Sequence, residues 1–310
     1  MDFTLNILGT ASALPTVNRY PSAQVLDVRG RLFLIDCGEG AQMQMRRLGL
    51  SFLKVDVICL SHIHGDHLFG IFGLLSTMGM LGRKTPLRVF APKSFGPILK
   101  FFLSYFGEGL QFQIEHYPLS MKEPEKVMDT KAVDLYAFPL RHRIEAFGFL
   151  FREKEPQRNI YKDSIEKYGL GIAEMGHLKN GEDIVREDGT VIRNADVTYR
   201  PYDPRSFAYC SDTAPFPELP QWVHGVDLLY HEATFPESMS ETAAATYHST
   251  TVQAAQCAAE AGVKRLVVGH YSSRFGDVRP FMDEMVPIFP KTVLAKEGDV
   301  IEVPLRRYIG

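Results

Sequence analysis

The chain has 310 residues, a formal net charge of −3 at pH 7 and an apolar fraction of 45%. This composition provides ample material for a buried core, so it excludes a disordered polypeptide and favours a globular protein. Nucleic-acid binders usually carry an excess of basic residues, so the bulk charge does not favour RNA, although a local patch or a bound metal can supply the field. We see neither a signal peptide nor a long apolar run, and we expect a cytoplasmic protein without a membrane span.

The first half of the chain predicts strands and helices in alternation. We expect strands at residues 3–8, 23–28, 31–36, 54–60 and 87–91, and helices at residues 41–48, 69–81 and 97–106. Arg29 and Gly30 join the second and third of these strands at the spacing of a β-hairpin. Gly49 follows the first helix and suits its C-terminal end.

The second half continues in the same style. We expect strands at residues 132–139, 147–152, 206–210, 228–230 and 265–268, and a helix at residues 251–261. Ser249 or Thr250 could cap this helix. Strands that alternate with helices predict a layered α/β architecture.

The cysteines give no sign of a disulfide framework. The four of them are far apart and form no Cys-x-x-Cys pair; they are Cys37, Cys59, Cys210 and Cys257. Cys59 lies inside an apolar run, where it is expected to be a small core residue.

Residues 152–200 differ in composition, because they are dense in charge and poor in large apolar clusters. The simpler interpretation is a solvated surface insertion, and the alternative is a protruding arm that touches a substrate. Composition alone favours the solvated insertion.

The strongest chemical signal is the segment 60–67, with the sequence LSHIHGDH. Four potential metal ligands lie within six residues, namely His62, His64, Asp66 and His67. The first two lie at alternate positions and face the same way in an extended backbone. Gly65 then permits a tight turn, which brings the other two back toward the same point. The buried strand before them would place the cluster at its carboxyl end, where α/β sheets carry their sites.

A single histidine is more often a satisfied core or surface residue than a metal ligand. Three histidines and an aspartate packed this closely are costly to bury without a cation. The segment therefore predicts a metal site.

The pattern His-x-His-x-Asp-His resembles the signature of the metallo-β-lactamase superfamily. This resemblance implies an α/β fold in which one domain, residues 1–310, forms a four-layer αββα sandwich. Further ligands of the family come from later loops. Here His142 lies at an expected strand–strand loop, and Asp212 and His270 each follow an apolar run. From the pattern alone, His142 between two arginines could be a surface residue, and Asp212 before Thr213 could be a turn cap.

The resemblance implies two zinc ions per subunit, although the nitrogen and oxygen ligands also suit manganese or iron. The ligands of one ion would be His62, His64 and His142. Those of the other would be Asp66, His67 and His270. Asp212 would bridge the two, and a hydroxide between the ions would attack the substrate.

Further motifs resemble the ribonuclease Z family within this superfamily, over essentially the whole chain. They are residues 8–15 (LGTASALP), 33–40 (FLIDCGEG), 231–234 (HEAT) and 248–250 (HST). The resemblance implies an endoribonuclease that removes the 3′ trailer of precursor tRNA and leaves a 3′-hydroxyl on the tRNA.

The same resemblance implies roles for individual side chains. Asp36 would orient a metal-bound histidine, as carboxylates around metal sites do. Asp66 would act as general base, and His248, kept protonated by Glu232, would be the general acid. The alternative for Glu232 and His248 is a hydrogen-bonded pair with a purely structural role.

The resemblance also implies a flexible arm at residues 153–198 that binds precursor tRNA, and a homodimer in which the arm of one subunit serves the partner's active site. Residues 169–174 (GLGIAE) lack the Pro-Gly element common in such arms. An alternative function is a phosphodiesterase or esterase of the same fold that acts on small substrates. A non-catalytic RNA-binding scaffold with structural zinc is a third, but structural sites are closed and often use cysteine, which this ligand set lacks.

Overall fold

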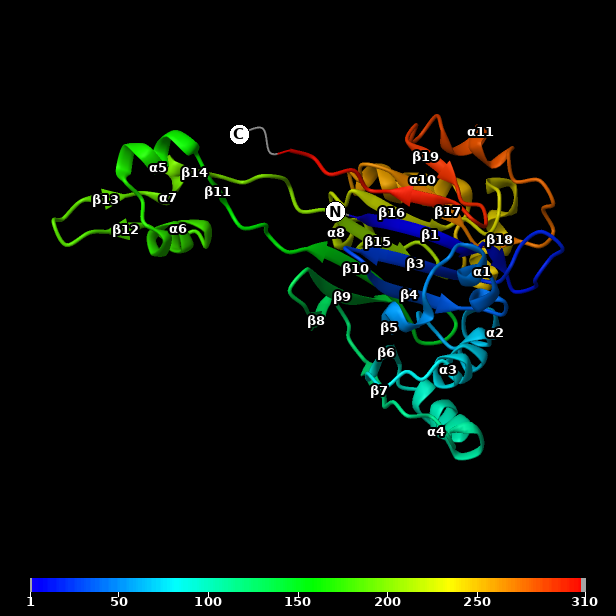
Figure 1. Cartoon of the computed structure of the whole chain (residues 1–310). Helices are drawn as coiled ribbons and strands as arrows, with labels where there is room; N and C mark the ends of the chain where they lie inside the picture. Colours follow the sequence, from blue (N-terminus) through cyan, green and yellow to red (C-terminus); the bar gives the residue numbers. More distant parts are fainter. Residues whose placement is uncertain (1, 308–310) are drawn as a thin grey trace. The chain divides into compact units, whose positions relative to one another are not determined.

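The fold was obtained as a computed structural model, which describes residues 2–307 (Figure 1). The chain separates into two compact units. The larger one, called the body here, comprises Met1–Arg152 and Ser206–Val303. The smaller one, called the insertion unit, comprises Glu153–Arg205 and Pro304–Gly310.

Two seven-stranded sheets form the middle of the body. The first runs in the order β20 (Val300–Glu302), β1 (Phe3–Gly9), β3 (Ala23–Val28), β4 (Arg31–Cys37), β5 (Val55–Cys59), β6 (Leu87–Pro92) and β7 (Ile114–Leu119). The second runs in the order β19 (Thr292–Leu294), β17 (Leu266–Gly269), β16 (Leu228–Glu232), β15 (Ser206–Cys210), β10 (Ala146–Glu153), β9 (Val133–Leu140) and β8 (Glu125–Asp129). A short parallel pair joins β2 (Ala11–Ser12) to β18 (Tyr271–Ser272).

Local signals explain several of these elements. The turn between β3 and β4 uses Arg29 and Gly30, both with positive φ, and pairs Val28 with Arg31. Two successive residues of this kind make the turn that matches the twist of a hairpin. Helix α10 (Thr251–Glu260) is capped by Thr250, whose side chain accepts from the backbone N–H of Gln253 in a capping box.

Helices cover the outer face of each sheet (Figure 1). The first sheet is covered by α1 (Ala41–Arg47), α3 (Gly70–Met80) and α4 (Phe95–Phe106). The second is covered by α8 (Leu219–Trp222), α10 and α11 (Phe281–Met285). Shorter elements are η1 (Phe52–Lys54), α2 (Gly65–Leu68), η2 (Glu237–Met239) and α9 (Ser240–Thr246).

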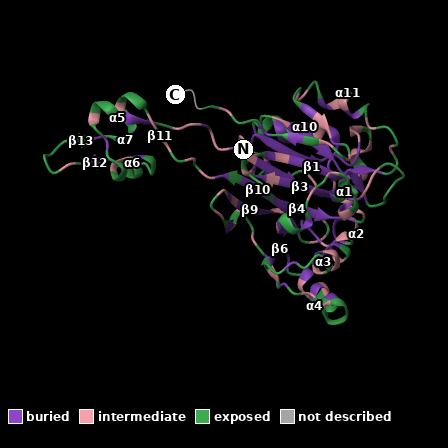
Figure 2. Ribbon diagram, in the orientation of Figure 1, coloured by how far each residue is buried: buried purple, intermediate pink, exposed green. Residues whose placement is uncertain are grey.

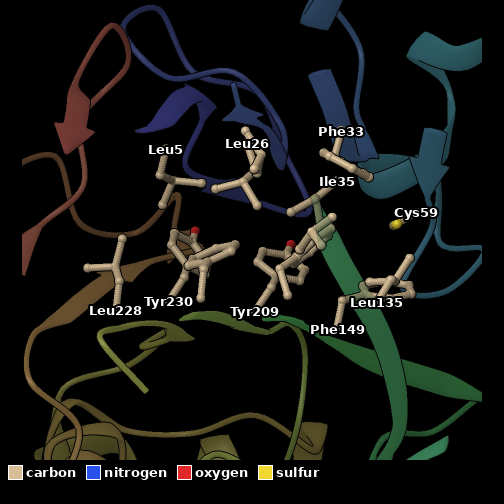
Figure 3. Close-up of a cluster of buried hydrophobic side chains, with 14 of the residues drawn as sticks. Leu5, Leu26, Phe33, Ile35, Cys59, Leu135, Phe149, Tyr209, Leu228 and Tyr230 are labelled. Atoms are coloured by element: carbon tan, nitrogen blue, oxygen red, sulfur yellow. The ribbon is translucent and has the colours of Figure 1, made fainter. Parts of the chain in front are cut away.

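Three apolar layers hold this arrangement together. The period of two along β4 sends Phe33 and Ile35 to the layer between the sheets, while Leu32 and Leu34 meet the helices. In the middle layer, side chains such as Phe149 come from the second sheet and meet those of the first (Figure 3). The buried residues form continuous bands along both sheets (Figure 2). The body is therefore a four-layer αββα sandwich, as predicted.

The insertion unit has a small core of its own, which the sequence analysis did not anticipate. Its elements are β11 (Asn159–Ile160), α5 (Lys162–Tyr168), α6 (Ile172–Lys179), β12 (Ile184–Val185), β13 (Val191–Ile192), α7 (Asn194–Val197) and β14 (Thr198–Tyr199). Leu170, Leu178 and Ile192 are buried together among the charged residues. They are spread one by one along the chain, so no local cluster revealed them.

A buried ion pair lies where the insertion unit begins and ends in the sequence. The Arg205 side chain donates from Nε to Glu153 Oε2 at 2.8 Å and from Nη2 to Oε1 at 2.9 Å. Both side chains are almost fully buried. Within residues 2–307, no helix has the length and apolar character needed to cross a membrane.

Candidate active site

The seven predicted ligands come together at the ends of strands from both sheets. Among the groups whose ligand atoms all lie within 4.8 Å of one another, two consist only of predicted ligands. The first is His62, His64, His142 and Asp212, and the second is Asp66, His67 and His270. These are the groups expected for two neighbouring metal ions, with the aspartate at position 212 between them.

Asp212 faces both groups with different oxygens. Its Oδ2 lies 3.5 Å from His62 Nε2 and 3.8 Å from His142 Nε2. Its Oδ1 lies 3.3 Å from His67 Nε2 and 3.1 Å from His270 Nε2. A carboxylate placed in this way can bridge two cations.

Asp36 orients two imidazoles through their Nδ1 atoms, which face away from the centre of the cluster. His67 Nδ1 donates to Asp36 Oδ2 at 2.8 Å. His62 Nδ1 lies 2.9 Å from Ser61 Oγ, and this hydroxyl donates to Asp36 Oδ2 at 2.8 Å, so it accepts from His62. Tyr209 also donates to Asp36 Oδ2, at 2.7 Å. In its neutral form, each of the two imidazoles is therefore protonated at Nδ1 and presents a lone pair at Nε2.

Two further imidazoles have the same arrangement. His142 Nδ1 donates to the carbonyl oxygen of Tyr247 at 3.1 Å. His270 Nδ1 lies 2.9 Å from Thr234 Oγ1, and this hydroxyl donates to Glu232 Oε2 at 2.5 Å. Since the hydroxyl proton is directed to the carboxylate, the hydroxyl oxygen accepts from His270.

The ring nitrogens that face into the cluster lie close to one another. His62 Nε2 is 3.0 Å from His64 Nδ1, and His67 Nε2 is 3.2 Å from His270 Nε2. Lone pairs and carboxylates that converge in this way repel one another unless a cation lies between them. The donor set therefore fits divalent metal ions, which nitrogen and oxygen ligands bind well.

The electrostatics of the cluster point the same way. Burial alone would lower the pKa of His67, but Asp212, Asp66 and Asp36 outweigh it and hold the pKa well above its usual value. Burial would raise the pKa of Asp212, yet the surrounding imidazoles keep it well below the usual range. The carboxylates thus stay ionised and attract positive charge, which a proton or a metal ion can supply.

Glu232 and His248 form a hydrogen-bonded pair beside the candidate metal ligands. His248 Nδ1 donates to Glu232 Oε1 at 2.8 Å, and the backbone N–H of Thr213 donates to the same oxygen at 2.9 Å. Burial alone would lower the pKa of His248, but the Glu232 carboxylate outweighs it and raises the pKa to about 9. The imidazole is therefore protonated near neutral pH, as a general acid requires.

Unusual backbone conformations accompany the site. Asp36 and His270 adopt positive φ values of 53° and 62°, which are uncommon for residues with a side chain. Gly38 packs so closely that a Cβ on it would lie 2.4 Å from the carbonyl oxygen of Asp66. Conformations of this kind cluster at functional sites, where the surrounding structure holds them.

An open cavity of about 590 Å³ gives access both to the candidate metal ligands and to His248. It is lined by Ser12, Ala13, Pro15, Pro21, Glu39, His64, Gly65, Asp66, Phe69, His142, Arg143, Asp212, Thr246 and His248. Candidate metal ligands and the His248 side chain thus face the same space, where one substrate can reach both.

Sequence reasoning missed the hydroxyl groups that orient the ligands. Ser61, Thr234 and Tyr209 are each buried and bonded to a carboxylate at the site. Ser61 is adjacent to a ligand and Thr234 lies in the HEAT motif, so their positions were a usable signal. Tyr209 had none, because its role follows from the packing of the two sheets.

Two family models match the sequence. Residues 3–155 match the model of the anti-Pycsar protein Apyc1. Residues 188–271 match the model of the beta-lactamase superfamily domain.

Relatives match over nearly the whole chain. Ribonuclease Z of Bacteroides thetaiotaomicron is 44% identical over 302 residues, which cover 97% of this chain and 95% of the relative. Ribonuclease Z of Cytophaga hutchinsonii is 44% identical over 301 residues, covering 96% and 95%. Among solved structures, the short form of human tRNase Z superposes with a TM-score of 0.72 at 25% identity, covering 97% of this chain and 99% of that one.

Proposed function

The chain belongs to the ribonuclease Z family of endoribonucleases, and we propose that it removes the 3′ trailer of precursor tRNA, leaving a 3′-hydroxyl on the tRNA. The observation that carries this proposal is the Glu232–His248 pair placed directly beside two groups of metal ligands around one open cavity. We propose the cytoplasm as the location of this reaction, because the enzyme would encounter precursor tRNA there.

We assign two zinc ions to the cluster. His62, His64 and His142 would hold one, Asp66, His67 and His270 the other, and Asp212 both. When bound, the ions would supply Lewis acidity at the phosphate and activate water for attack.

Asp66 would receive the proton of the attacking water. Burial would raise the pKa of its carboxyl group, but His67 and His270 hold it below its usual value, so the group is ionised and can accept. Its Oδ2 also accepts the backbone N–H of Ala13 at 2.7 Å, which fixes its orientation.

His248 would donate the proton that the leaving group needs. Its Nδ1–H is engaged with Glu232, so the transferable proton is the one on Nε2. Donation of this proton to the 3′ oxygen of the upstream ribose releases the tRNA with a 3′-hydroxyl. Glu232 then stabilises the imidazole by holding Nδ1–H in place.

The insertion unit is assigned to binding precursor tRNA, as the arm expected at residues 153–198. Lys162, Lys167, Lys179 and Arg193 all lie on it and could contact phosphates. Truncation of this segment should raise the KM for precursor tRNA far more than the KM for a small diester.

We assign a homodimer on the basis of an apolar groove between α3 and α4. Phe72, Ile98 and Phe102 line it, together with Phe101 and Phe106, which are more than half exposed. A twofold interface needs one surface that is both groove and protrusion, and this face offers both. Light scattering should give twice the chain mass, and Phe101→Glu should give monomers.

The central experiment is cleavage of a 3′-extended tRNA by the purified protein, with mapping of both product ends. We expect a 3′-hydroxyl at the tRNA end, loss of cleavage with a chelator and recovery with zinc. Asp212→Asn is the matched variant, because it removes one charge between the two ligand groups without changing size. Turnover of bis(p-nitrophenyl) phosphate together with an intact precursor would instead favour a small-substrate phosphodiesterase.

A further inference from the structure

The charges around the cavity are unevenly distributed. Three acidic side chains line it, those of Glu39, Asp66 and Asp212. Arg143 is the one lysine or arginine among its lining residues. A polynucleotide brings several phosphates into such a cavity. The metal site and His248 would act on the one phosphate that is cut, and on no other. The remaining phosphates need a cationic partner of their own.

Arg143 is held in place by the segment that also fixes a ligand. Its Nη2 donates to the carbonyl oxygen of Ala245 at 2.9 Å, at the end of α9. The preceding residue, His142, donates to the carbonyl oxygen of Tyr247 in the same segment. The position of the guanidinium is thereby tied to the metal centre and to the neighbouring His248.

The guanidinium nevertheless keeps most of its donors available. It has five N–H groups, and across residues 2–307 the Ala245 carbonyl is its one hydrogen-bond partner. Arg143 is exposed, while the His142 side chain is only 2% exposed, so the two neighbours point to different surroundings. His142 turns inward to the cluster, and Arg143 stays in the open part of the cavity.

We propose that Arg143 binds a backbone phosphate of the RNA that flanks the phosphate being cut. A planar guanidinium pairs with two phosphate oxygens at once, which fixes the path of the strand as well as adding affinity. This inference rests on the proposed function, because a substrate with a single phosphate offers no flanking group. Arg143 is thus a specificity-determining residue, because its contact favours polynucleotides over small diesters.

The chain offers a matched control in Arg141. It is exposed, carries the same charge and lies two positions away, but it does not line the cavity. Its contacts with Thr213 and Ala214 use backbone atoms, so a change of its side chain leaves them intact. If only the loss of a positive charge matters, Arg141→Ala and Arg143→Ala should have the same effect. If Arg143 makes a specific phosphate contact, only Arg143→Ala should have an effect.

The test compares Arg143→Ala, Arg143→Lys and Arg141→Ala in the metal-loaded, full-length protein. The substrates are a 3′-extended tRNA and bis(p-nitrophenyl) phosphate, each measured for kcat and KM at several salt concentrations. For Arg143→Ala we expect KM for the precursor to rise about tenfold or more, with the slope of log affinity against log salt reduced by about one. The loss of kcat/KM should be at least about tenfold larger on the precursor than on the ester, and lysine should restore part of it.

Several outcomes overturn the assignment while leaving the proposed function intact. These are an unchanged KM for the precursor, an equal loss on both substrates, or an equal effect of Arg141→Ala. An equal loss on both substrates would place Arg143 at the cut phosphate itself or assign it a structural role. If the wild-type protein hydrolyses the ester but leaves the precursor intact, the proposed function fails first and this inference fails with it.

Discussion

Replacing Glu232 with glutamine should shift the alkaline limit of activity. The carboxylate raises the pKa of His248 to about 9, and the side chain amide keeps the shape but removes the charge. What then remains is burial and the charge of His67, which disfavour the imidazolium, and the charge of Asp212, which favours it, so the pKa should fall toward the ordinary value of 6.5. The general acid acts in its protonated form, so activity is present below this pKa and is lost as pH rises through it.

The magnitude follows from the two pKa values. At about pH 8, an imidazole with a pKa of about 9 is roughly nine-tenths protonated, whereas one with a pKa of 6.5 is roughly 3% protonated. The variant should therefore lose up to about 30-fold in kcat/KM at that pH from protonation alone. The deficit should shrink toward about pH 6, where both proteins carry the proton.

The assay is the pH profile of kcat/KM on 3′-extended tRNA, from about pH 6 to about pH 10. Glu39→Gln is the control. Glu39 lines the same cavity, and its substitution removes the same charge, but the carboxylate bonded to His248 is that of Glu232. The control should keep the wild-type alkaline limb. If Glu232→Gln lowers activity equally at every pH, then Glu232 does not maintain the proton on His248, and the purely structural interpretation of the pair holds.

Three further perturbations test the metal centre and the core. Thr234→Val should weaken zinc binding about 10- to 100-fold in a chelator competition, because His270 loses the acceptor that fixes its tautomer, and Thr234→Ser should restore it. Gly38→Ala should cut kcat by about 100-fold while the far-ultraviolet circular dichroism stays unchanged, because its Cβ would press on the backbone of Asp66, 2.4 Å away. Phe149→Ala should lower the free energy of unfolding by about 3–5 kcal/mol in urea titrations, since it empties part of the layer between the sheets.

Residues that act through local sequence were predictable. The segment 60–67 places four potential ligands directly after an apolar strand, so they lie close together wherever that strand ends. Asp212 and His270 also follow apolar runs, and His142 lies at an expected strand–strand loop, but only the family resemblance selected the three among other candidates. The structure brings all three to the same cluster, because strands from both sheets end at one edge.

Contacts that depend on sheet packing were not predictable. Tyr209 reaches Asp36 across the layer between the two sheets, over a separation of 173 residues. Nothing in the sequence near either residue carries that information. The same holds for β19 and β20, which are three residues long and lie at the ends of the two sheets, where pairing rather than composition defines them.

The register of β16 decides whether the chemistry is possible. Cys210 of β15 pairs with His231, and Glu232 pairs with Gly269 of β17, so three parallel strands end at nearly the same level. Alternation along the strand sends Glu232 to the site and turns its neighbour His231 toward a pocket on the α10 side. A slip of one residue would exchange the two and leave His248 without its carboxylate. Since buried neighbours on both faces fix this register, the packing of the sheet itself sets the protonation state of the acid.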